Sequence, residues 1–300
     1  MPPETRRLDG RPVAAAVDEA TRRRIAAAPP GTRPPTLASV HRGLPTPFGF
    51  YRRQQARAAA AAGIRFRDEP LPPDAGPAEL AALLERLDAD PSVHAVLLEH
   101  PLPPPFDFGT AIAHLRPDKD VDGVGAANLG ALLDGRARHA PAVALAAVEI
   151  ARHYRLPFEG EPVAVVGRSA TVGLPLALLL AARPPGADAT VTVAHSRTAD
   201  LQGALARART IFSCAGRPGL LRRAVVPEGA AIVDVGLSSV PDPDRPGGVR
   251  AVGDADGADL DGWADALTPV PGGVGPVTVA ALMRSTVDAW ERLEGVGREP

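Results

Sequence analysis

Residues 162–182 read PVAVVGRSATVGLPLALLLAA, and this stretch indicates the fold. The apolar run Pro162–Gly167 is typical of a buried β-strand, and an apolar helical pattern begins after Gly173. A strand that stops at glycine and reopens as a helix offers backbone N–H groups and the positive end of a helix dipole to a phosphate. The spacing alone leaves two interpretations open, a dinucleotide site and a simple tight turn.

Alternating strands and helices continue on both sides of this stretch, which predicts α/β units with parallel sheets covered by helices on both faces. We expect strands at Thr36–Val40, Ile64–Phe66, His94–His100, Thr190–Ser196, Thr210–Ser213 and Ala231–Val235. We expect helices at Leu8–Ala28, about Phe50–Ala62 (ended by Gly63), Ala78–Leu87, Ala142–Tyr154 and Val277–Leu293.

The amino-acid composition and the net charge argue against several classes of protein. A chain of 300 residues with 45% apolar content usually forms two domains. The net charge of -2, with arginines scattered among acids, gives no reason to expect nucleic acid as a partner. No apolar run reaches the ~20 residues that span a bilayer, and the polar N-terminus is unlike a signal peptide. We therefore expect a soluble cytoplasmic protein without membrane contact.

Two residue types are scarce. The single cysteine, Cys214, lies in the apolar run TIFSCAG and is interpreted as structural. The single lysine, Lys119, lies in PDKDVDG and is interpreted as a structural surface cation, with a displaced acid/base role as the alternative. We expect no metal site.

The strand that ends at His195 and Ser196 favours one cofactor over another. NAD-binding Rossmann domains usually place an acidic residue there, whereas this chain continues with Arg197 and Thr198 and has Arg168 on the facing turn. A 2′-phosphate would meet no repelling carboxylate. The sequence therefore predicts NADP rather than NAD.

Near the C-terminus, Thr268–Thr278 reads TPVPGGVGPVT. Proline fixes φ and glycine permits positive φ and close approach of a flat ligand to the main chain. The segment is interpreted either as a tight loop before a helix or as a shaped surface for a ligand.

Six segments in order resemble the bifunctional methylenetetrahydrofolate dehydrogenase/cyclohydrolase family. They are LDG (8–10), AAGI (61–64), PDKDVDG (117–123), GRSATVGLP (167–175), DVG (234–236) and GD (253–254). The resemblance implies a folate-binding catalytic domain of residues 1–141 plus 277–300, with the C-terminal helix packing back on it. It also implies a Rossmann-like NADP domain of residues 142–276, and a homodimer. Its implied cofactor contacts are Gly167, Arg168, Ser169, Gly173, Ser196 and Leu237.

At the one-carbon site the sequence departs from the family. The family's tyrosine matches Tyr51, but the lysine four residues later is Gln55, and the glutamine before Pro-Leu-Pro is Glu99. A glutamine amide cannot transfer a proton as a lysine can. The family's serine three residues before the tyrosine is Phe48, and its Pro-Cys-Thr-Pro segment is PAVA (141–144).

The remaining folate contacts that the resemblance implies are Asp122, for the amidine-like edge of the pterin, and Pro271, Gly272 and Gly273, for the cleft floor. Taken alone, Asp122 would be a turn former and Tyr51 a packing residue. His100, beside Glu99, is a second candidate for a displaced acid/base.

These observations predict NADP-dependent, reversible oxidation of 5,10-methylenetetrahydrofolate to 5,10-methenyltetrahydrofolate, with Tyr51, Gln55, Glu99 and Asp122 as the catalytic set. Cyclohydrolase activity is expected to be weak or lost. Two alternatives stay open, a fully bifunctional enzyme that uses a displaced acid/base and a non-catalytic folate- and NADP-binding paralogue.

Overall fold

The computed structural model describes residues 4–42, 48–183, 187–242 and 248–297, with only the backbone of residues 48–50. The chain forms two compact units. Unit 1 comprises residues 1–14 and 143–278, and unit 2 comprises residues 15–142 and 279–300. The borders fall inside helices α1 (Gly10–Ala26), α6 (Ala142–His153) and α10 (Val274–Glu294). The altered Phe48 has its side chain outside the described residues.

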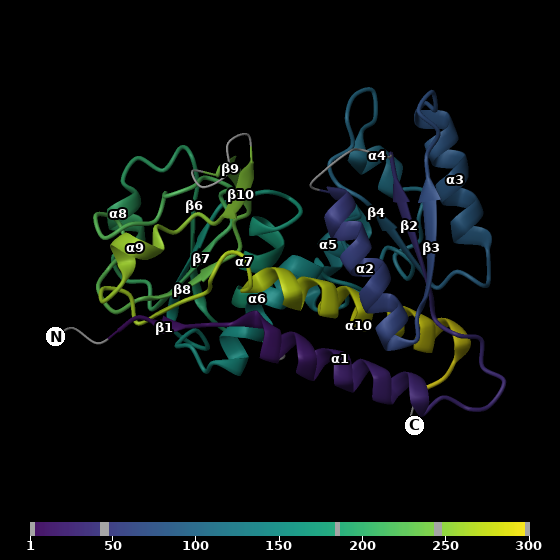
Figure 1. The fold of residues 1–300 in the computed structure, drawn as a ribbon, viewed down its shortest axis with the longest axis horizontal. Coiled ribbons are helices and arrows are strands. Elements are labelled where there is room, and N and C mark those ends of the chain that lie inside the picture. Colours follow the sequence, from purple (N-terminus) through teal and green to yellow (C-terminus); the bar gives the residue numbers. More distant parts are fainter. Residues whose placement is uncertain (1–3, 43–47, 184–186, 243–247, 298–300) are drawn as a thin grey trace. The chain divides into compact units, whose positions relative to one another are not determined.

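Unit 2 is built on a three-stranded parallel sheet in the order β3-β2-β4. The strands are β2 (Thr36–His41), β3 (Arg65–Pro70) and β4 (Ala95–Leu98), with Thr36 opposite Arg65 and Leu37 opposite Ala95. A parallel bridge between Val96 and Asp120 adds a short segment beside β4. Helices α2 (Phe48–Ala62) and α3 (Pro77–Ala89) connect the strands and cover opposite faces of the sheet (Figure 1).

The period of two along each strand divides the residues of this sheet between its faces. Ala38, Val40, Val96 and Leu98 pack in one buried cluster with the four leucines of α3. Ser39 alternates with Ala38 and Val40 and therefore faces α2. Further along the chain in this unit lie α4 (Phe108–Ile112), α5 (Ala126–Ala131) and the 3-10 turn η1 (Leu132–Asp134). The end of α10 also packs in unit 2, where the buried Trp290 donates its indole N–H to the carbonyl of Arg33 at 2.6 Å.

Unit 1 contains a six-stranded parallel sheet in the order β1-β11-β8-β7-β5-β6. Its strands are β1 (Arg6–Arg7), β5 (Pro162–Val166), β6 (Thr190–Ala194), β7 (Thr210–Ser213), β8 (Ala231–Asp234) and β11 (Ala266–Leu267). The chain order reverses at β5, because β6 lies on one side of it and β7 on the other. A crevice at the carboxyl ends of such strands is the usual ligand site of an open parallel sheet.

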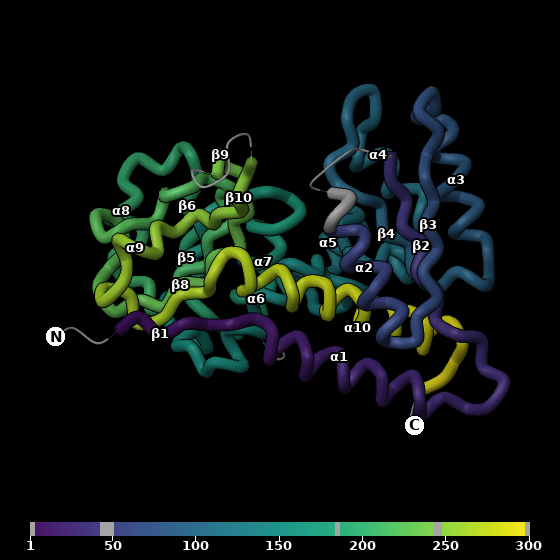
Figure 2. Tube along the Cα trace, in the orientation of Figure 1, coloured from purple at the N-terminus to yellow at the C-terminus, as the bar shows by residue number. Residues whose placement is uncertain are grey.

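Helices cover this sheet on both faces. Helix α7 (Gly173–Ala181) follows β5, and α8 (Leu201–Leu205) and α9 (Gly257–Leu260) contribute Leu205 and Leu260 to the buried cluster on the other side. Figure 2 traces these crossovers in teal, green and yellow. An antiparallel pair, β9 (Ser238–Pro241) and β10 (Val249–Val252), stands apart from the main sheet.

The N-terminal residues pack with unit 1, whereas the sequence division placed them in the folate domain. Strand β1 pairs with β11, and the N–H of Gly10 donates to the carbonyl of Gly272 at 2.8 Å. The hydroxyl of Tyr154 also donates to the carbonyl of Asp9 at 2.7 Å. These contacts have no signal in the local sequence, because β1 is only two residues long.

Candidate functional site

Three polar side chains from different elements of unit 2 meet near the carboxyl end of its sheet, on the face that α2 covers. Ser39 of β2 donates its hydroxyl to Oε1 of Glu99, which follows β4, at 3.1 Å. The side chain of Gln55 on α2 also hydrogen-bonds the Glu99 carboxyl. The sequence predicted Gln55 and Glu99 but not Ser39, whose only signal is a hydroxyl inside an otherwise apolar strand. We call Ser39, Gln55 and Glu99 the carboxyl cluster.

Gln55 is unusual for a polar side chain on a surface helix, because it is only 1% exposed. Its Oε1 has no hydrogen-bond partner among the described residues. Tyr51, one turn earlier and partly buried, lies on the same face of α2 because residues i and i+4 are neighbours on a helix. The two family positions therefore share a helix face, as the spacing predicted.

Burial shapes the ionisation of Glu99. It raises the pKa of this carboxyl, while the hydrogen bonds from Ser39 and Gln55 and the positive charge of Arg52 oppose the shift. Arg52 itself pairs with Asp68, its Nε lying 3.3 Å from Oδ1 of that residue. Glu99 therefore holds a proton at higher pH than an exposed glutamate does.

Asp122 is the second carboxyl of this region. It follows the segment beside β4, and its Oδ1 accepts a hydrogen bond from the N–H of Ala142, the first residue of α6, at 3.1 Å. Burial raises its pKa to about 7, the bond from Ala142 opposes the shift, and the negative charges of Asp120 and Glu99 add to it. Asp122 thus shares an electrostatic environment with Glu99 and also caps a helix.

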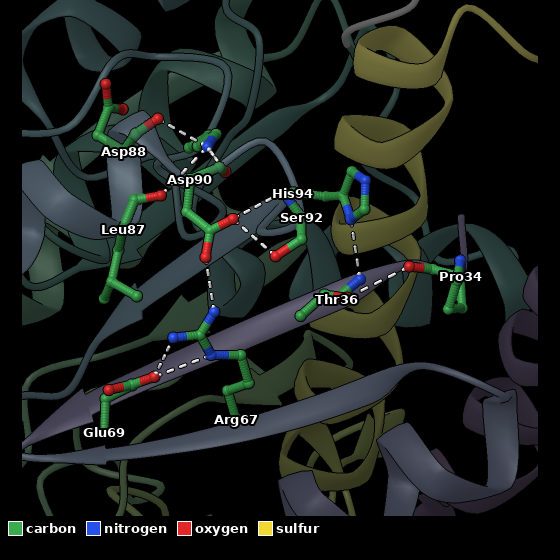
Figure 3. Close-up of polar contacts among 10 residues, drawn as sticks. Pro34, Thr36, Arg67, Glu69, Leu87, Asp88, Asp90, Ser92 and His94 are labelled. Atoms are coloured by element: carbon green, nitrogen blue, oxygen red, sulfur yellow. Dashed lines mark hydrogen bonds and ion pairs between the residues drawn. The ribbon is translucent and has the colours of Figure 1, made fainter. Parts of the chain in front are cut away.

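Lys119 is buried rather than a surface cation. Only 2% of the residue is exposed, and its Nζ donates to the carbonyls of Leu87, Asp88 and Asp90 at 3.1, 2.7 and 2.7 Å. An ammonium group has three donors, so all of them are used at the C-terminal end of α3. Figure 3 shows this end of α3, where the Asp90 carboxylate also binds Arg67 and Ser92. Lys119 is structural and is no displaced acid/base.

His100 also lies apart from the carboxyl cluster. Its ring stacks on Phe108 of α4, with centroids 3.5 Å apart, and Phe108 packs against the α3-facing core. Burial lowers the pKa of His100. The side chain is thus on the opposite face of the sheet from Glu99.

In unit 1 the turn after β5 has the close packing that its glycines predicted. Gly167 has φ +128°, and a Cβ on it would meet the carbonyl oxygen of Cys214 at 2.6 Å. A Cβ on Gly173 would collide with the backbone of Gly167. The Ser169 hydroxyl accepts hydrogen bonds from the N–H groups of Val172 and Gly173 at 3.2 and 3.3 Å. Because Ser169 already caps α7, a phosphate would bind mainly to the turn before the helix.

The other predicted cofactor residues lie at the carboxyl ends of the strands. Arg168 and Ser169 follow β5, Ser196 follows β6, and Leu237 follows β8; the first three are exposed, and Leu237 is 68% exposed. Arginine rather than a carboxylate follows Ser196 at these strand ends. The glycine-bounded turn and these side chains fit a dinucleotide that carries a 2′-phosphate.

The DVG and GD motifs interlock at the carboxyl end of β8. Asp254 accepts hydrogen bonds from the Ser213 hydroxyl and the N–H of Ala215, each at 2.8 Å. Asp234 accepts from the N–H groups of Asp254 and Gly236, each at 3.0 Å. A Cβ on Gly236 would collide with the Asp254 carboxyl, and a Cβ on Gly253 with the Asp234 carboxyl. Each glycine makes room for the other motif's aspartate, so this pair has a structural role.

The proline- and glycine-rich loop packs on the start of α1. A Cβ on Gly10 would collide with the carbonyl of Gly273, and one on Gly273 would meet the carbonyl oxygen of Pro269 at 2.7 Å. Gly272 has φ +110°. The glycines of LDG and PGG are therefore needed for backbone packing within unit 1. The folate contacts predicted for Pro271, Gly272 and Gly273 stay a prediction.

A cavity of about 460 Å³ lies elsewhere in unit 1, where β1, β8 and β11 end. It is lined by Glu4–Arg7, Asp234, Val252, Gly253, Ala255, Gly257, Asp261 and Leu267–Val270. None of the predicted cofactor contacts lines it.

The described residues also bear on the cysteine, on metal binding and on membrane-spanning helices. Burial raises the pKa of the Cys214 thiol to about 12, with the charge of Asp254 adding to the shift, so the thiol is held in its unreactive form. In the described part of the chain, no group of three histidine, cysteine, aspartate or glutamate residues could hold a metal ion. No described helix is long and apolar enough to cross a membrane.

Comparisons with known proteins cover nearly the whole chain. Residues 8–122 match the tetrahydrofolate dehydrogenase/cyclohydrolase catalytic domain, and residues 141–294 match the NAD(P)-binding domain of the same family. The bifunctional protein FolD 3 of Rhizorhabdus wittichii is 40% identical over 294 residues, which are 96% of this chain and 94% of that protein. The FolD protein of Nocardia farcinica is also 40% identical, over 97% of this chain and all of that protein.

A solved structure is similar over the same length. It is the N5,N10-methylenetetrahydrofolate dehydrogenase-cyclohydrolase of Trypanosoma brucei, in complex with NADP and an inhibitor. It has a TM-score of 0.88 and 35% identity, and the match covers 97% of this chain and 98% of that one.

Proposed function

Because the chain belongs to the tetrahydrofolate dehydrogenase/cyclohydrolase family, we propose that it oxidises 5,10-methylenetetrahydrofolate reversibly to 5,10-methenyltetrahydrofolate with NADP. We further propose that its hydrolysis of the methenyl bridge is weak or lost. The observation that carries this second part is the buried amide of Gln55, which hydrogen-bonds Glu99 at the position where the family has a lysine.

The two reactions need different groups. Hydrolysis requires a proton to leave the attacking water, and general acid/base help is typically worth ~10²–10⁴ in rate. The Gln55 amide donates and accepts hydrogen bonds but has no group that titrates near neutral pH, so it cannot act as a general acid or base. Hydride transfer instead requires the donor carbon to be held against the acceptor ring, and it needs no base. Loss of the lysine therefore weakens hydrolysis selectively.

The turn after β5 would hold NADP, whose chemistry when bound is the acceptance of a hydride. Gly167 and Gly173 keep this turn tight, while Arg168, Ser169 and Ser196 offer charge and hydrogen bonds to phosphate oxygens. Leu237 would contact the cofactor through its exposed apolar side chain.

In the folate site, Tyr51 would stack on an aromatic ring of the substrate and Asp122 would bind the amidine-like edge of the pterin. The carboxylate form of Asp122 makes that bidentate contact. Because its pKa is about 7, substrate binding is expected to strengthen as the pH rises from 6 to 8.

A second candidate is the fully bifunctional enzyme, with Glu99 as the displaced acid/base. The raised pKa of Glu99 favours it, since a carboxyl that titrates closer to neutrality is a better proton acceptor. Lys119, the other candidate for this role, is excluded by its three carbonyl partners.

One assay tests the proposal and separates these candidates. The purified protein is supplied with 5,10-methylenetetrahydrofolate and NADP or NAD, and reduced cofactor and methenyl product are followed at separate wavelengths. We expect reduction of NADP, a lower rate with NAD, and accumulation of the methenyl product. The double variant Gln55→Lys/Glu99→Gln, which restores the family pair, should hydrolyse added methenyltetrahydrofolate about 10²-fold faster than the natural protein or more.

Gln55→Met/Glu99→Gln is the matched control, because methionine has a similar length but no proton to exchange. It should not gain hydrolysis. Absence of any NADP reduction would refute the dehydrogenase, and rapid methenyl hydrolysis by the natural protein would refute the proposed loss.

A further inference from the structure

In the carboxyl cluster, no described cation binds the carboxyl of Glu99. Its hydrogen-bond partners, Ser39 and Gln55, are neutral. Among the described residues Glu99 makes no ion pair, and Arg52 is engaged by Asp68 and by Nδ1 of His41, 2.9 Å from its Nη1. A carboxylate removed from water usually has a positive partner, because burying its charge alone is costly.

Two further groups in this region are incompletely satisfied. One lacks a hydrogen-bond donor, and the other lacks a positive charge. The Oε1 of Gln55 is buried without a partner in the described part of the protein, although buried acceptors are normally satisfied. Asp122, the other buried carboxyl, is close enough for the charge of Glu99 to act on it. Two carboxyls and a free amide oxygen together favour a ligand that brings positive charge.

The proposed reaction generates such a ligand. The methylene carbon of the substrate is bonded to two nitrogens and carries no charge. When a hydride leaves it for NADP⁺, one C–H bond breaks with its electron pair, and the N–C–N bridge becomes a delocalised amidinium cation. The methenyl product therefore has one positive charge more than the substrate at the reacting bridge.

We propose that Glu99 is the counter-ion of the methenyl cation, so that this site binds the product with its cationic bridge in preference to folates that carry no charge at these nitrogens. This inference rests on the proposed function. It adds that the exchange of the family's pair, lysine and glutamine, for Gln55 and Glu99 reverses the charge at the bridge. A cation there repels the product, whereas a carboxylate stabilises it and the transition state that leads to it.

The test measures binding without NADP. The affinities of the natural protein and of Glu99→Gln are compared for two ligands. One is 5,10-methenyltetrahydrofolate, whose N–C–N bridge is cationic, and the other is tetrahydrofolate, in which no carbon bridges these two nitrogens. Glutamine has nearly the shape of glutamate and keeps an acceptor for Ser39. We expect Glu99→Gln to weaken methenyltetrahydrofolate binding about 10- to 100-fold, which is the effect of one partly buried charge a few ångströms away. Tetrahydrofolate binding should weaken less than about threefold.

Ser39→Ala is the matched control, because it removes a hydrogen bond to Glu99 but keeps the carboxyl itself. It should change the two affinities by similar factors. Retained tetrahydrofolate binding also shows that each variant is folded.

Equal effects of Glu99→Gln on both ligands would overturn the inference. So would loss of methenyl hydrolysis in this variant with an unchanged preference for the cation, since Glu99 would then be a general base. Neither result affects the proposed dehydrogenase, which fails only if the natural protein does not reduce NADP with methylenetetrahydrofolate.

Discussion

Asp122 is a residue where stability and the proposed function oppose each other. Its carboxyl caps α6 through the N–H of Ala142, yet burial and the charges of Asp120 and Glu99 raise its pKa to about 7. In the unfolded chain the pKa of an aspartate is about 3.8. A raised pKa means that the folded protein binds the proton more tightly, so the stability contributed by this group is present at low pH and is lost as the pH rises through 7. Above neutral pH the folded protein therefore carries a buried carboxylate that lowers its stability, at the position where a folate would bind.

Replacement of Asp122 by asparagine is therefore expected to stabilise the protein above neutral pH. The amide removes the buried charge and keeps an oxygen that can accept from Ala142. We expect the free energy of unfolding at pH 8 to rise by about 1–3 kcal/mol, a gain that shrinks between pH 7 and pH 5, while folate affinity falls. Urea unfolding at several pH values measures the first effect. Asp74→Asn, at an exposed aspartate of the same unit, should change stability little, and an Asp122→Asn protein that is less stable at pH 8 would contradict the argument.

At the scale of elements, the connection between β5 and α7 shows how two glycines fix a tight turn. Gly173 lies against the backbone of Gly167, and Ser169 closes the first turn of the helix. The turn has no room for an added methyl group, so the position of the helix depends on this contact.

Gly173→Ala is thus expected to push α7 away from β5 and to displace residues 167–169. We expect at least about tenfold weaker NADP binding and a lower melting temperature. The control is Gly275→Ala in α10, which meets nothing within 4 Å. That change should leave NADP binding unaltered and stabilise its helix slightly, because alanine is the better helix former. Unchanged NADP affinity in Gly173→Ala would show that the turn does not bind the cofactor.

At the scale of the whole molecule, the family resemblance predicts a homodimer formed through the nucleotide domains. Unit 1 exposes apolar side chains near its antiparallel strand pair, with Val249 of β10 70% exposed and Leu237 68% exposed. Exposed strand edges with apolar residues are favourable for pairing with another chain.

Sedimentation equilibrium should accordingly give a mass of twice 31.0 kDa. Val249→Asp should weaken the dimer if β10 lies in its interface, and Leu133→Asp, at an exposed leucine of unit 2, is the control. A mass of 31.0 kDa at every concentration would contradict the expected dimer.

Long patterns in the sequence predicted the elements that carry the fold. The strands at 36–40, 162–167, 190–196, 210–213 and 231–235 and the helices around them are confirmed, because each has enough residues to show a period and clear glycine or proline boundaries. The short strands β1 and β11 and the pair β9–β10 were missed. A two-residue strand has no period, and it forms only because a neighbouring strand supplies its hydrogen bonds.

The sequence by itself determined the family and the residue types at the one-carbon position, since both depend on identity and order along the chain. Only the tertiary structure decided what each side chain touches. It enclosed Lys119 among three carbonyls, turned His100 to the far face of the sheet, and brought Ser39 and Gln55 to the carboxyl of Glu99. The contacts of Lys119 and Glu99 join residues 29 to 60 positions apart, and His100 and Glu99, which are neighbours in sequence, lie on opposite faces of the sheet. The balance of charge at a buried site depends on all of these contacts together.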